Sequence, residues 1–332
     1  MKRILSLILA VVMVFAVCAL SGCGKEESDK TDANPSDSKS FTVGICQLVQ
    51  HPALDEATKG FKEALSEKLG DKVTFNEQNA SNDTATCVTI ANQFVSSKVD
   101  LIFANATPAL QAAAAATDSI PIIGTSITDY ATALDISDWK GTTGKNITGT
   151  SDLAPLDQQA AMVAELCPAD KYPKVGIIYC SGEANSLYQV NVITPQLEKL
   201  GYTVKAFAFS DSNDVASVTT AACNESDVIY IPTDNTAASC TEAINNIASQ
   251  AKKPIIAGEE GICKGCGLAT LSISYYDIGY KAGLMAYDVL AEGKDISTYE
   301  VAFADSVTKK YNKANADNIG ITIPDGYEAI AE

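Results

Sequence analysis

From residue 41 onward, short apolar runs alternate with longer stretches in which apolar residues recur every three or four positions. A continuous apolar run of about four to eight residues is typical of a buried strand, whereas the longer spacing is typical of one face of a helix. In residues 53–69, for example, Leu54, Phe61 and Leu65 fall on the same helical face. Strands separated by helices of this length indicate right-handed βαβ crossovers, so the pattern predicts an α/β fold with parallel sheets.

The pattern occurs twice along the chain. In the first half the expected strands are 41–49, 73–78, 100–104 and 120–125, and the expected helices are 53–69, 84–97 and 108–117. The pattern breaks near 146–152 and then begins again. In the second half the expected strands are 174–180, 203–209, 227–231 and 254–257, and the expected helices are 155–166, 186–200, 215–222 and 237–250. A strand at 267–274 and a helix at 276–291 follow. Because about 290 residues exceed what one core usually organises, we expect two similar Rossmann-like lobes.

The first 23 residues have the composition of a bacterial export signal. Two basic residues precede an apolar run, 4–20, which is followed by Ser-Gly and then Cys23. This ending resembles the bacterial lipobox, in which the cysteine receives a diacylglyceryl group. We therefore expect residues 1–22 to be a signal peptide and Cys23 to carry a lipid. The alternative is an uncleaved membrane anchor helix, for which the run is short.

A polar segment follows the expected lipid site. Residues 24–40 contain five acidic residues, Pro35 and several serines, and no aliphatic or aromatic side chain larger than that of alanine. Such a segment cannot bury a core, so we expect 23–40 to be a disordered tether. A flexible chain of this length reaches roughly 20 to 25 Å, which is enough to hold a folded body just off a membrane.

The formal charge of the chain is -17, and it becomes -19 when the two basic residues of the signal are removed. A protein that binds nucleic acid needs a basic surface, so the charge argues against a nucleic-acid partner. The acidity otherwise favours solubility and gives no information about the fold.

Eight cysteines remain in the body of the chain after Cys18 and Cys23. Four of them lie in apolar strand or helix patterns, and we interpret them as buried free thiols: they are Cys46, Cys87, Cys180 and Cys223. The pair Cys263 and Cys266 favours a local disulfide or two loop thiols, because a zinc site needs two more ligands and the only histidine is His51. We therefore expect no metal site.

Small polar residues gather where the expected strands end. In open parallel sheets, ligands bind beyond the carboxyl ends of the strands, where the following helices point their N-termini. The polar residues at these positions are Gln47, His51, Asn105, Thr107, Ser126, Thr128, Asp129, Ser151, Asp152, Ser181, Glu183, Asn185, Ser186, Thr233, Asp234, Asn235, Thr236, Glu259 and Glu260. The two halves therefore predict polar edges that face a shared cleft.

Thr107 and Pro108 begin the third expected helix. Thr107 can cap this helix, and proline suits its first position because no N–H is needed there. The remaining N–H groups and the positive helix end would bind a carboxylate, although an ordinary cap explains the motif equally well. Asn185-Ser186 and Asn235-Thr236 leave the same two alternatives open. Three such helix starts converging on one cleft would favour ligand binding.

The remaining candidates each allow two interpretations. His51 is either a hydrogen-bonding residue of the cleft or a loop histidine, since no Gly-x-Ser-x-Gly elbow accompanies it. Glu183 and Asp234 could each neutralise a ligand ammonium or be solvated loop carboxylates. Glu259 and Glu260 are interpreted as surface charge, and Glu259 is the better cleft candidate of the two because it directly follows a strand. No Gly-x-Gly-x-x-Gly follows the first strand, which disfavours a dinucleotide cofactor.

These residues resemble the family of ABC-transporter substrate-binding lipoproteins associated with tryptophan and tyrosine uptake. The likeness runs from Val43 to Pro324, and its motifs are specific only when taken together. They are Val43-Gly44-Ile45 with Gln47, His51-Pro52-Ala53-Leu54-Asp55, Ala106-Thr107-Pro108-Ala109, Thr128-Asp129, Asn146-Ile147-Thr148-Gly149-Thr150-Ser151-Asp152, Glu183-Ala184-Asn185-Ser186, Asp234-Asn235 and Tyr276-Asp277-Ile278-Gly279.

The resemblance implies a periplasmic-binding-protein fold of type I, with two lobes joined by a three-segment hinge. Lobe 1 would comprise 41–148 plus about 270–299, and lobe 2 would comprise 149–269 plus about 300–332. It also implies solute contacts at the motif positions, which are Gln47, Thr107, Pro108, Ala109, Thr128, Asp129, Ser151, Glu183, Asn185, Ser186, Asp234 and Asn235. His51 and Glu259 join them because of their places after strands.

The resemblance further implies a monomeric lipoprotein on the outer face of the cell membrane, without a cofactor. It would close on an amino acid of the tryptophan, tyrosine and phenylalanine type and deliver it to ABC permease and ATPase subunits. Tyr188 and Tyr130 are possible stacking partners for such a side chain. A receptor that signals to a membrane partner, and an exported enzyme, are the alternatives.

Overall fold

The structure is a computed structural model that describes residues 39–331. The expected signal peptide, Cys23 and all but the last two residues of the expected tether lie outside this range. From Lys39 onward the chain forms one compact unit. In the described part of the chain, no helix combines the length and the apolar character needed to cross a membrane.

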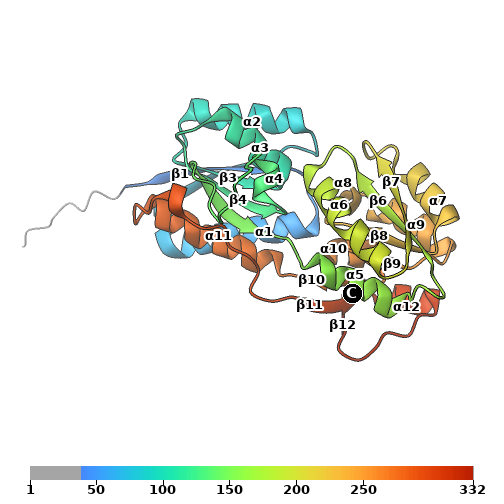
Figure 1. The fold of residues 1–332 in the computed structure, drawn as a ribbon. Coiled ribbons are helices and arrows are strands. Elements are labelled where there is room, and N and C mark those ends of the chain that lie inside the picture. Colours follow the sequence, from blue (N-terminus) through green and yellow to red (C-terminus); the bar gives the residue numbers. More distant parts are fainter. Residues whose placement is uncertain (1–38, 332) are drawn as a thin grey trace, which may run out of the picture. The chain divides into compact units, whose positions relative to one another are not determined.

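Lobe 1 is built on a parallel sheet with the strand order β2-β1-β3-β4-β5 (Figure 1). Its elements in chain order are β1 (Phe41–Gln47), α1 (Pro52–Leu69), the 3-10 turn η1 (Gly70–Lys72), β2 (Val73–Asn79), α2 (Thr84–Ser97), β3 (Leu101–Asn105), α3 (Thr107–Ala116), β4 (Ile122–Ile127), α4 (Tyr130–Ala133) and β5 (Ile147–Ser151). On one face, Phe61 of α1 stacks on Phe103 of β3 with ring centroids 3.8 Å apart. Helices α2 and α3 cover the other face, where Phe94 is fully buried.

Lobe 2 is built on a sheet with the order β12-β11-β10-β9-β8-β6-β7, parallel apart from the β10–β11 pair. Its elements are α5 (Leu156–Leu166), β6 (Lys174–Cys180), α6 (Ala184–Lys199), β7 (Thr203–Phe209), α7 (Val215–Glu225), β8 (Val228–Ile231), α8 (Asn235–Ser239), α9 (Thr241–Gln250), β9 (Ile255–Ala257), α10 (Glu260–Cys266), β10 (Ala269–Ser272), β11 (Thr308–Tyr311), α12 (Lys313–Ile319) and β12 (Glu328–Ala329). Two hydrophobic clusters pack against this sheet, and Tyr230 and Phe209 are among their largest buried side chains.

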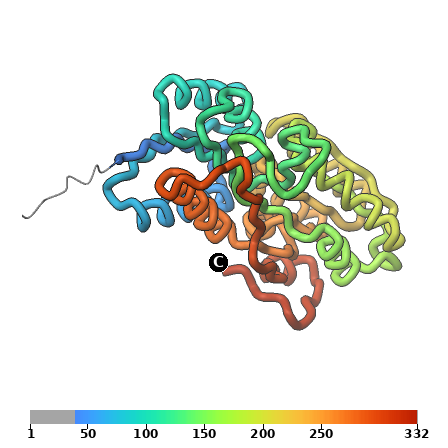
Figure 2. The backbone as a smooth tube through the Cα atoms, turned by 60° about the vertical axis from the view of Figure 1, so that its left-hand side comes forward, coloured from blue at the N-terminus to red at the C-terminus, as the bar shows by residue number. Residues whose placement is uncertain are grey.

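Three segments connect the two sheets. The chain leaves lobe 1 after β5, returns after β10 to form α11 (Tyr275–Leu290) and the short η2 (Ile296–Thr298), and crosses again before β11. Figure 2 traces the last of these passages from α11 in orange to the red C-terminal segment. Helix α11 packs tightly on α1: a Cβ added at Gly279 would lie 2.0 Å from the Ala57 carbonyl oxygen. This close approach holds α11 on lobe 1.

The positions of the crossings differ from those expected. Residues 149–151 belong to β5, which pairs with β4 in the lobe 1 sheet. Residues 270–272 belong to β10, which pairs with β9 and β11 in lobe 2, so only the chain from 273 onward returns to lobe 1. A buried strand has the same apolar pattern in either sheet, so periodicity does not assign it to a lobe.

Candidate ligand-binding cleft

The predicted contact residues follow the strands of both sheets, and all of them are buried except Asp129, which is half-buried. Two hydrogen bonds join the lobes directly across the cleft. His51 Nε2 lies 3.3 Å from Asn235 Oδ1, and Asn82 Nδ2 donates to Thr236 Oγ1 at 3.0 Å. The lobes are therefore closed on one another, with polar side chains enclosed between them.

The turns after β3 and β4 hold strained backbone conformations. Ala106 has φ 89° and ψ 155°, a region that is almost exclusive to glycine, and Ser126 has φ 56°. Such strain persists only where the surroundings enforce it, and it is concentrated at functional sites. Ala106 is the N-cap of α3, so Thr107 lies in the first turn and its hydroxyl does not cap the helix. The expected Thr107 cap is therefore wrong.

Five buried polar atoms of the cleft have no hydrogen-bond partner within residues 39–331. They are His51 Nδ1, Asn105 Oδ1, Thr107 Oγ1, Ser126 Oγ and Asn185 Oδ1. Buried polar atoms are nearly always bonded, and an unsatisfied one costs about 1 to 3 kcal/mol. The two hydroxyls, together with the N–H groups in the first turn of α3, are donors suited to a carboxylate. The start of α3 and the turn after β4 therefore present unpaired donors to a polar group of a ligand.

Other predicted residues of lobe 1 bond within the protein. Gln47 donates to Asp55 and accepts from the Thr58 hydroxyl, and Asp129 caps α4. Ser151 donates to the Thr128 carbonyl, and the Thr128 hydroxyl donates to Asp152 Oδ1 at 3.1 Å.

Tyr130 is buried in lobe 1 and donates to the Thr150 carbonyl, so it packs in the core. Tyr188 of α6 is half-buried, and its pKa is raised by partial burial and by the Asp129 carboxylate. Of the two tyrosines, only Tyr188 remains a candidate for stacking.

The Glu183 carboxylate organises the rim of lobe 2, which is the edge of this lobe that faces lobe 1 and includes residues 183–186 and 234–236. Its Oε2 accepts from the backbone N–H and the Nδ2 of Asn235, at 3.0 and 2.7 Å. Its Oε1 accepts from the backbone N–H and the hydroxyl of Thr236, at 2.9 and 2.8 Å, and Asn185 Nδ2 adds a bond to Oε2 at 3.0 Å. One carboxylate therefore holds both residues of lobe 2 that bond directly to lobe 1.

Asp234 is a second internal acceptor on this rim. It caps α8 through the Ala237 N–H at 2.8 Å and accepts from the Cys180 N–H and the Ser186 hydroxyl at 2.6 and 2.7 Å. Burial, reinforced by Glu183, raises the pKa of Asp234 to about 7. Both carboxylates position neighbouring residues, and the prediction that one of them neutralises a ligand ammonium remains a prediction.

A small cavity between the lobes is lined by three carboxylates. Its lining residues are His51, Leu54, Asp152, Thr233, Asp234, Asn235, Ala238, Glu259 and Tyr275. Burial raises the pKa of Asp152 to about 6 and that of Glu259 to about 7, and repulsion from Asp152 adds to the rise at Glu259. Carboxylates whose pKa is raised by burial gain strongly from a nearby cation, so this cavity suits an ammonium group.

Asp152 and Tyr275 were not among the predicted contacts. Tyr275 donates to Asp152 Oδ2 at 2.9 Å, which joins the first crossing segment to the start of α11. The sequence places Asp152 at a strand end, but nothing distinguishes it from the other polar residues there. The only signal at Tyr275 is its place near the start of an expected helix.

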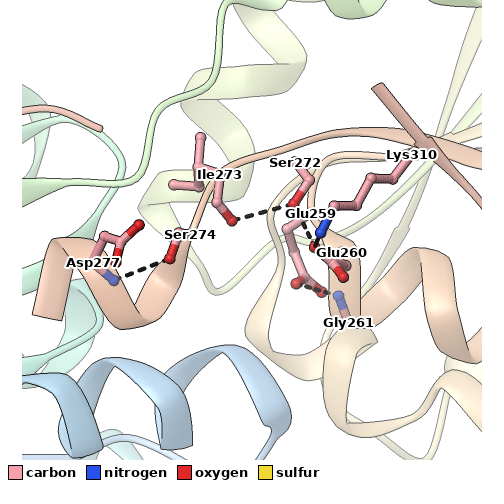
Figure 3. A network of polar contacts seen from close by, with 8 residues as sticks. All are labelled: Glu259, Glu260, Gly261, Ser272, Ile273, Ser274, Asp277 and Lys310. Carbon is pink, nitrogen blue, oxygen red and sulfur yellow. Dashed lines mark hydrogen bonds and ion pairs between the residues drawn. The ribbon is translucent and has the colours of Figure 1, made fainter. Parts of the chain in front are cut away.

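A larger groove of about 500 Å³ opens beside this cavity and shares Glu259 and Tyr275 with it. Figure 3 shows its polar contacts: Glu260 accepts from Ser272 at 2.6 Å and from Lys310 at 2.7 Å, and Glu259 accepts from the Gly261 N–H at 2.6 Å. The bonds from the Gly261 and Ile262 N–H groups fix the Glu259 carboxylate between the cavity and the groove.

The eight described cysteines are all free, and seven of them are buried. The interpretation of Cys46, Cys87, Cys180 and Cys223 as buried free thiols is therefore confirmed. Cys263 and Cys266 lie in α10, where burial raises the pKa of both thiols. The expectation of a disulfide or a loop at this pair is wrong. No cluster of histidine, cysteine and acidic residues in residues 39–331 has the arrangement of a metal site.

Residues 42–332 match the family of ABC transporter substrate binding proteins. The chain belongs to this family, its fold is that of the type I periplasmic binding proteins, and it is a substrate-binding protein of an ABC transporter. The family and the relatives described next are binding proteins rather than enzymes.

Three relatives are informative. A tyrosine-binding protein of Clostridioides difficile (strain R20291) is 39% identical over 338 residues, which cover 96% of this chain and 95% of the relative. The solved ABC domain in complex with L-Trp from Streptococcus pneumoniae is 33% identical and covers 88% and 100% of the two chains, with a TM-score of 0.83. The ligand-free, open structure of a substrate-binding protein with adhesive properties from Clostridium difficile is 34% identical and covers 87% and 99%, with a TM-score of 0.66.

Proposed function

We propose that this protein binds an aromatic amino acid of the tyrosine, tryptophan and phenylalanine type between its lobes and presents it to an ABC permease and its ATPase. One relative is named for tyrosine binding and another was solved with L-Trp, which supports this solute class. The observation that carries the proposal is the set of five unpartnered polar atoms in the part of the cleft described above. These atoms fit a ligand that has both donor and acceptor groups.

The arrangement of the lobes also supports the proposal. The TM-score is 0.83 with the L-Trp complex and 0.66 with the ligand-free, open structure, although the sequence identities are nearly equal at 33% and 34%. A solute that bonds to both lobes shifts the equilibrium toward the closed form. The closed cleft of this protein is therefore the form that a bound amino acid would stabilise.

Two regions of the cleft suit the two charged groups of an amino acid. The carboxylate fits the start of α3, where the Thr107 and Ser126 hydroxyls lack partners in the described chain. The ammonium fits the small cavity beside Asp152 and Glu259, whose ionised forms are disfavoured by burial. A zwitterion would supply a carboxylate to the unpaired hydroxyls at the start of α3 and an ammonium to the carboxylates of the small cavity.

A thermal-shift screen tests the solute class. A ligand at 100 times its Kd stabilises a protein by about 2.7 kcal/mol, which corresponds to about 4 to 5 °C in Tm for a body of about 290 residues. We expect L-tyrosine, L-tryptophan or L-phenylalanine to produce such a shift, and leucine, arginine and glucose to leave Tm unchanged. If a sugar or a nucleoside gives the largest shift and no aromatic amino acid raises Tm, the proposal is wrong.

We also propose that the mature protein begins at a lipid-modified Cys23, lies on the outer face of the cell membrane, and acts as a monomer without chemical turnover. The basic start, the apolar run and the Ser-Gly before Cys23 support the lipid anchor. We expect Cys23→Ser to block lipid attachment, measured by incorporation of a labelled fatty acid, and Cys18→Ser to leave it intact. Equal labelling of both variants would contradict the proposal.

A further inference from the structure

The contacts of His51 determine which of its ring nitrogens carries a proton. Glu183 Oε2 accepts both the backbone N–H and the Nδ2 of Asn235. Because a carboxylate oxygen accepts hydrogen bonds, the Asn235 amide turns its Nδ2 toward Glu183 and its Oδ1 toward His51. This Oδ1 only accepts, so its contact with His51 Nε2 at 3.3 Å places a proton on Nε2.

The other ring nitrogen is left as an acceptor because His51 is neutral. The side chain is 7% exposed, and burial lowers its pKa, against opposing influences of the Asn235 bond, Glu183 and Asp55. His51 is also the N-cap residue of α1, and the partial positive charge at this helix end disfavours the protonated, positively charged imidazole. In this neutral form Nδ1 bears a lone pair, and it has no partner among the residues that the structure describes.

We infer that His51 Nδ1 accepts a hydrogen bond from the bound solute, and that His51 selects solutes with an N–H or O–H donor at this point of the cleft. His51 lines the small cavity together with Asp152 and Glu259, so the donor approaches beside two carboxylates. The ammonium of an amino acid and the phenol or indole of its side chain are both such donors. The inference rests on the proposed function for the presence of a solute.

The chain contains a single histidine, so imidazole nitrogen-15 spectra of the untagged protein report on His51 alone. We expect the Nε2–H tautomer at pH 7.5 in the protein saturated with L-tyrosine or L-tryptophan, in which the closed lobes hold His51 against Asn235, and a shift of the Nδ1 resonance relative to the protein without a solute. A proton on Nδ1, or an imidazolium, in the protein with a bound amino acid would overturn the inference, whereas failure of every amino acid to bind would overturn the proposed function. An Nδ1 resonance that stays unchanged while a solute binds would overturn it as well.

Two amide variants separate a solute contact from a contact between lobes. Asparagine at position 51 places an acceptor near the position of Nδ1, and glutamine places a donor near the position of Nε2. We expect His51→Gln to bind L-tyrosine about 10- to 100-fold more weakly than His51→Asn does, because only the asparagine keeps an acceptor for the solute. Any result in which His51→Gln binds as well as His51→Asn, or better, overturns the inference.

Asn82→Ala is the matched control, because it removes the other direct bond between the lobes and leaves His51 in place.

Titrations with three solutes identify the donor. If the donor is in the side chain, His51→Gln weakens L-tyrosine and L-tryptophan and leaves L-phenylalanine unchanged. If the donor is the ammonium, all three weaken together. Unfolding of each variant without solute checks that the fold is kept, and the tautomer measurement does not depend on any variant.

Discussion

Replacing Glu183 with glutamine is expected to lower the affinity for the solute by at least about 100-fold and the free energy of unfolding by about 3 kcal/mol. In the wild type both carboxylate oxygens accept, and Asn235 and Thr236 supply four of the five donors. Glutamine replaces one acceptor with an N–H group that faces other donors. At least one buried donor then loses its acceptor, and the rim residues that bond to lobe 1 lose their fixed position.

Urea unfolding and calorimetric titration with L-tyrosine measure the two effects. Glu198→Gln is the matched control because Glu198 lies on the exposed side of α6, the helix that follows Glu183. We expect this control to change the free energy of unfolding by less than about 0.5 kcal/mol. If Glu183→Gln unfolds and binds as the control does, the Glu183 carboxylate does not organise the rim.

Most of the strands and long helices could be predicted from the sequence, because burial imposes a period on the apolar residues. The limits expected for residues 84–97, 174–180 and 203–209 are those that the structure has. Helix α10 was not expected. Its seven residues include two glycines, and so short a helix lacks the repeat that identifies one. Its two cysteines were therefore wrongly placed in a loop.

The site was predictable in location and less so in its contacts. The rule that ligands bind at the carboxyl ends of parallel strands selected nineteen polar residues, of which all but Asp129, Ser181, Thr233 and Glu260 are buried. The partner of each side chain depends on the packing of distant segments: His51 and Asn235 are 184 positions apart, and Asp152 meets a tyrosine 123 positions later. No local pattern carries that information. The internal bonds of Glu183 thus emerge only from the folded chain.

The Asp152 carboxylate is expected to make the ligand-free protein less stable at neutral pH than Asp152→Asn. Burial raises its pKa from 3.8 to about 6, so the folded state binds the proton more tightly than the unfolded state does. Below pH 3.8 the carboxyl group is protonated in both the folded and the unfolded state, so it does not lower the free energy of unfolding. As the pH rises from 3.8 through 6 the folded state loses stability, and above 6 the loss levels off at on the order of 3 kcal/mol. Asparagine keeps the shape between Thr128 and Tyr275 and removes the charge.

Urea unfolding at pH 4 and pH 7.5 checks this expectation, with Asp157→Asn at an exposed position of α5 as the control. We expect Asp152→Asn to exceed the wild type in stability at pH 7.5 and to match it at pH 4. The same variant should bind an amino acid about 10- to 100-fold more weakly, because a neutral amide does not attract the ammonium. A gain in stability joined to a loss of affinity marks a residue that is retained for binding. If the affinity of Asp152→Asn is unchanged, Asp152 does not attract the ammonium, and if Asp152→Asn is less stable than the wild type at pH 7.5, the buried Asp152 charge does not cost stability.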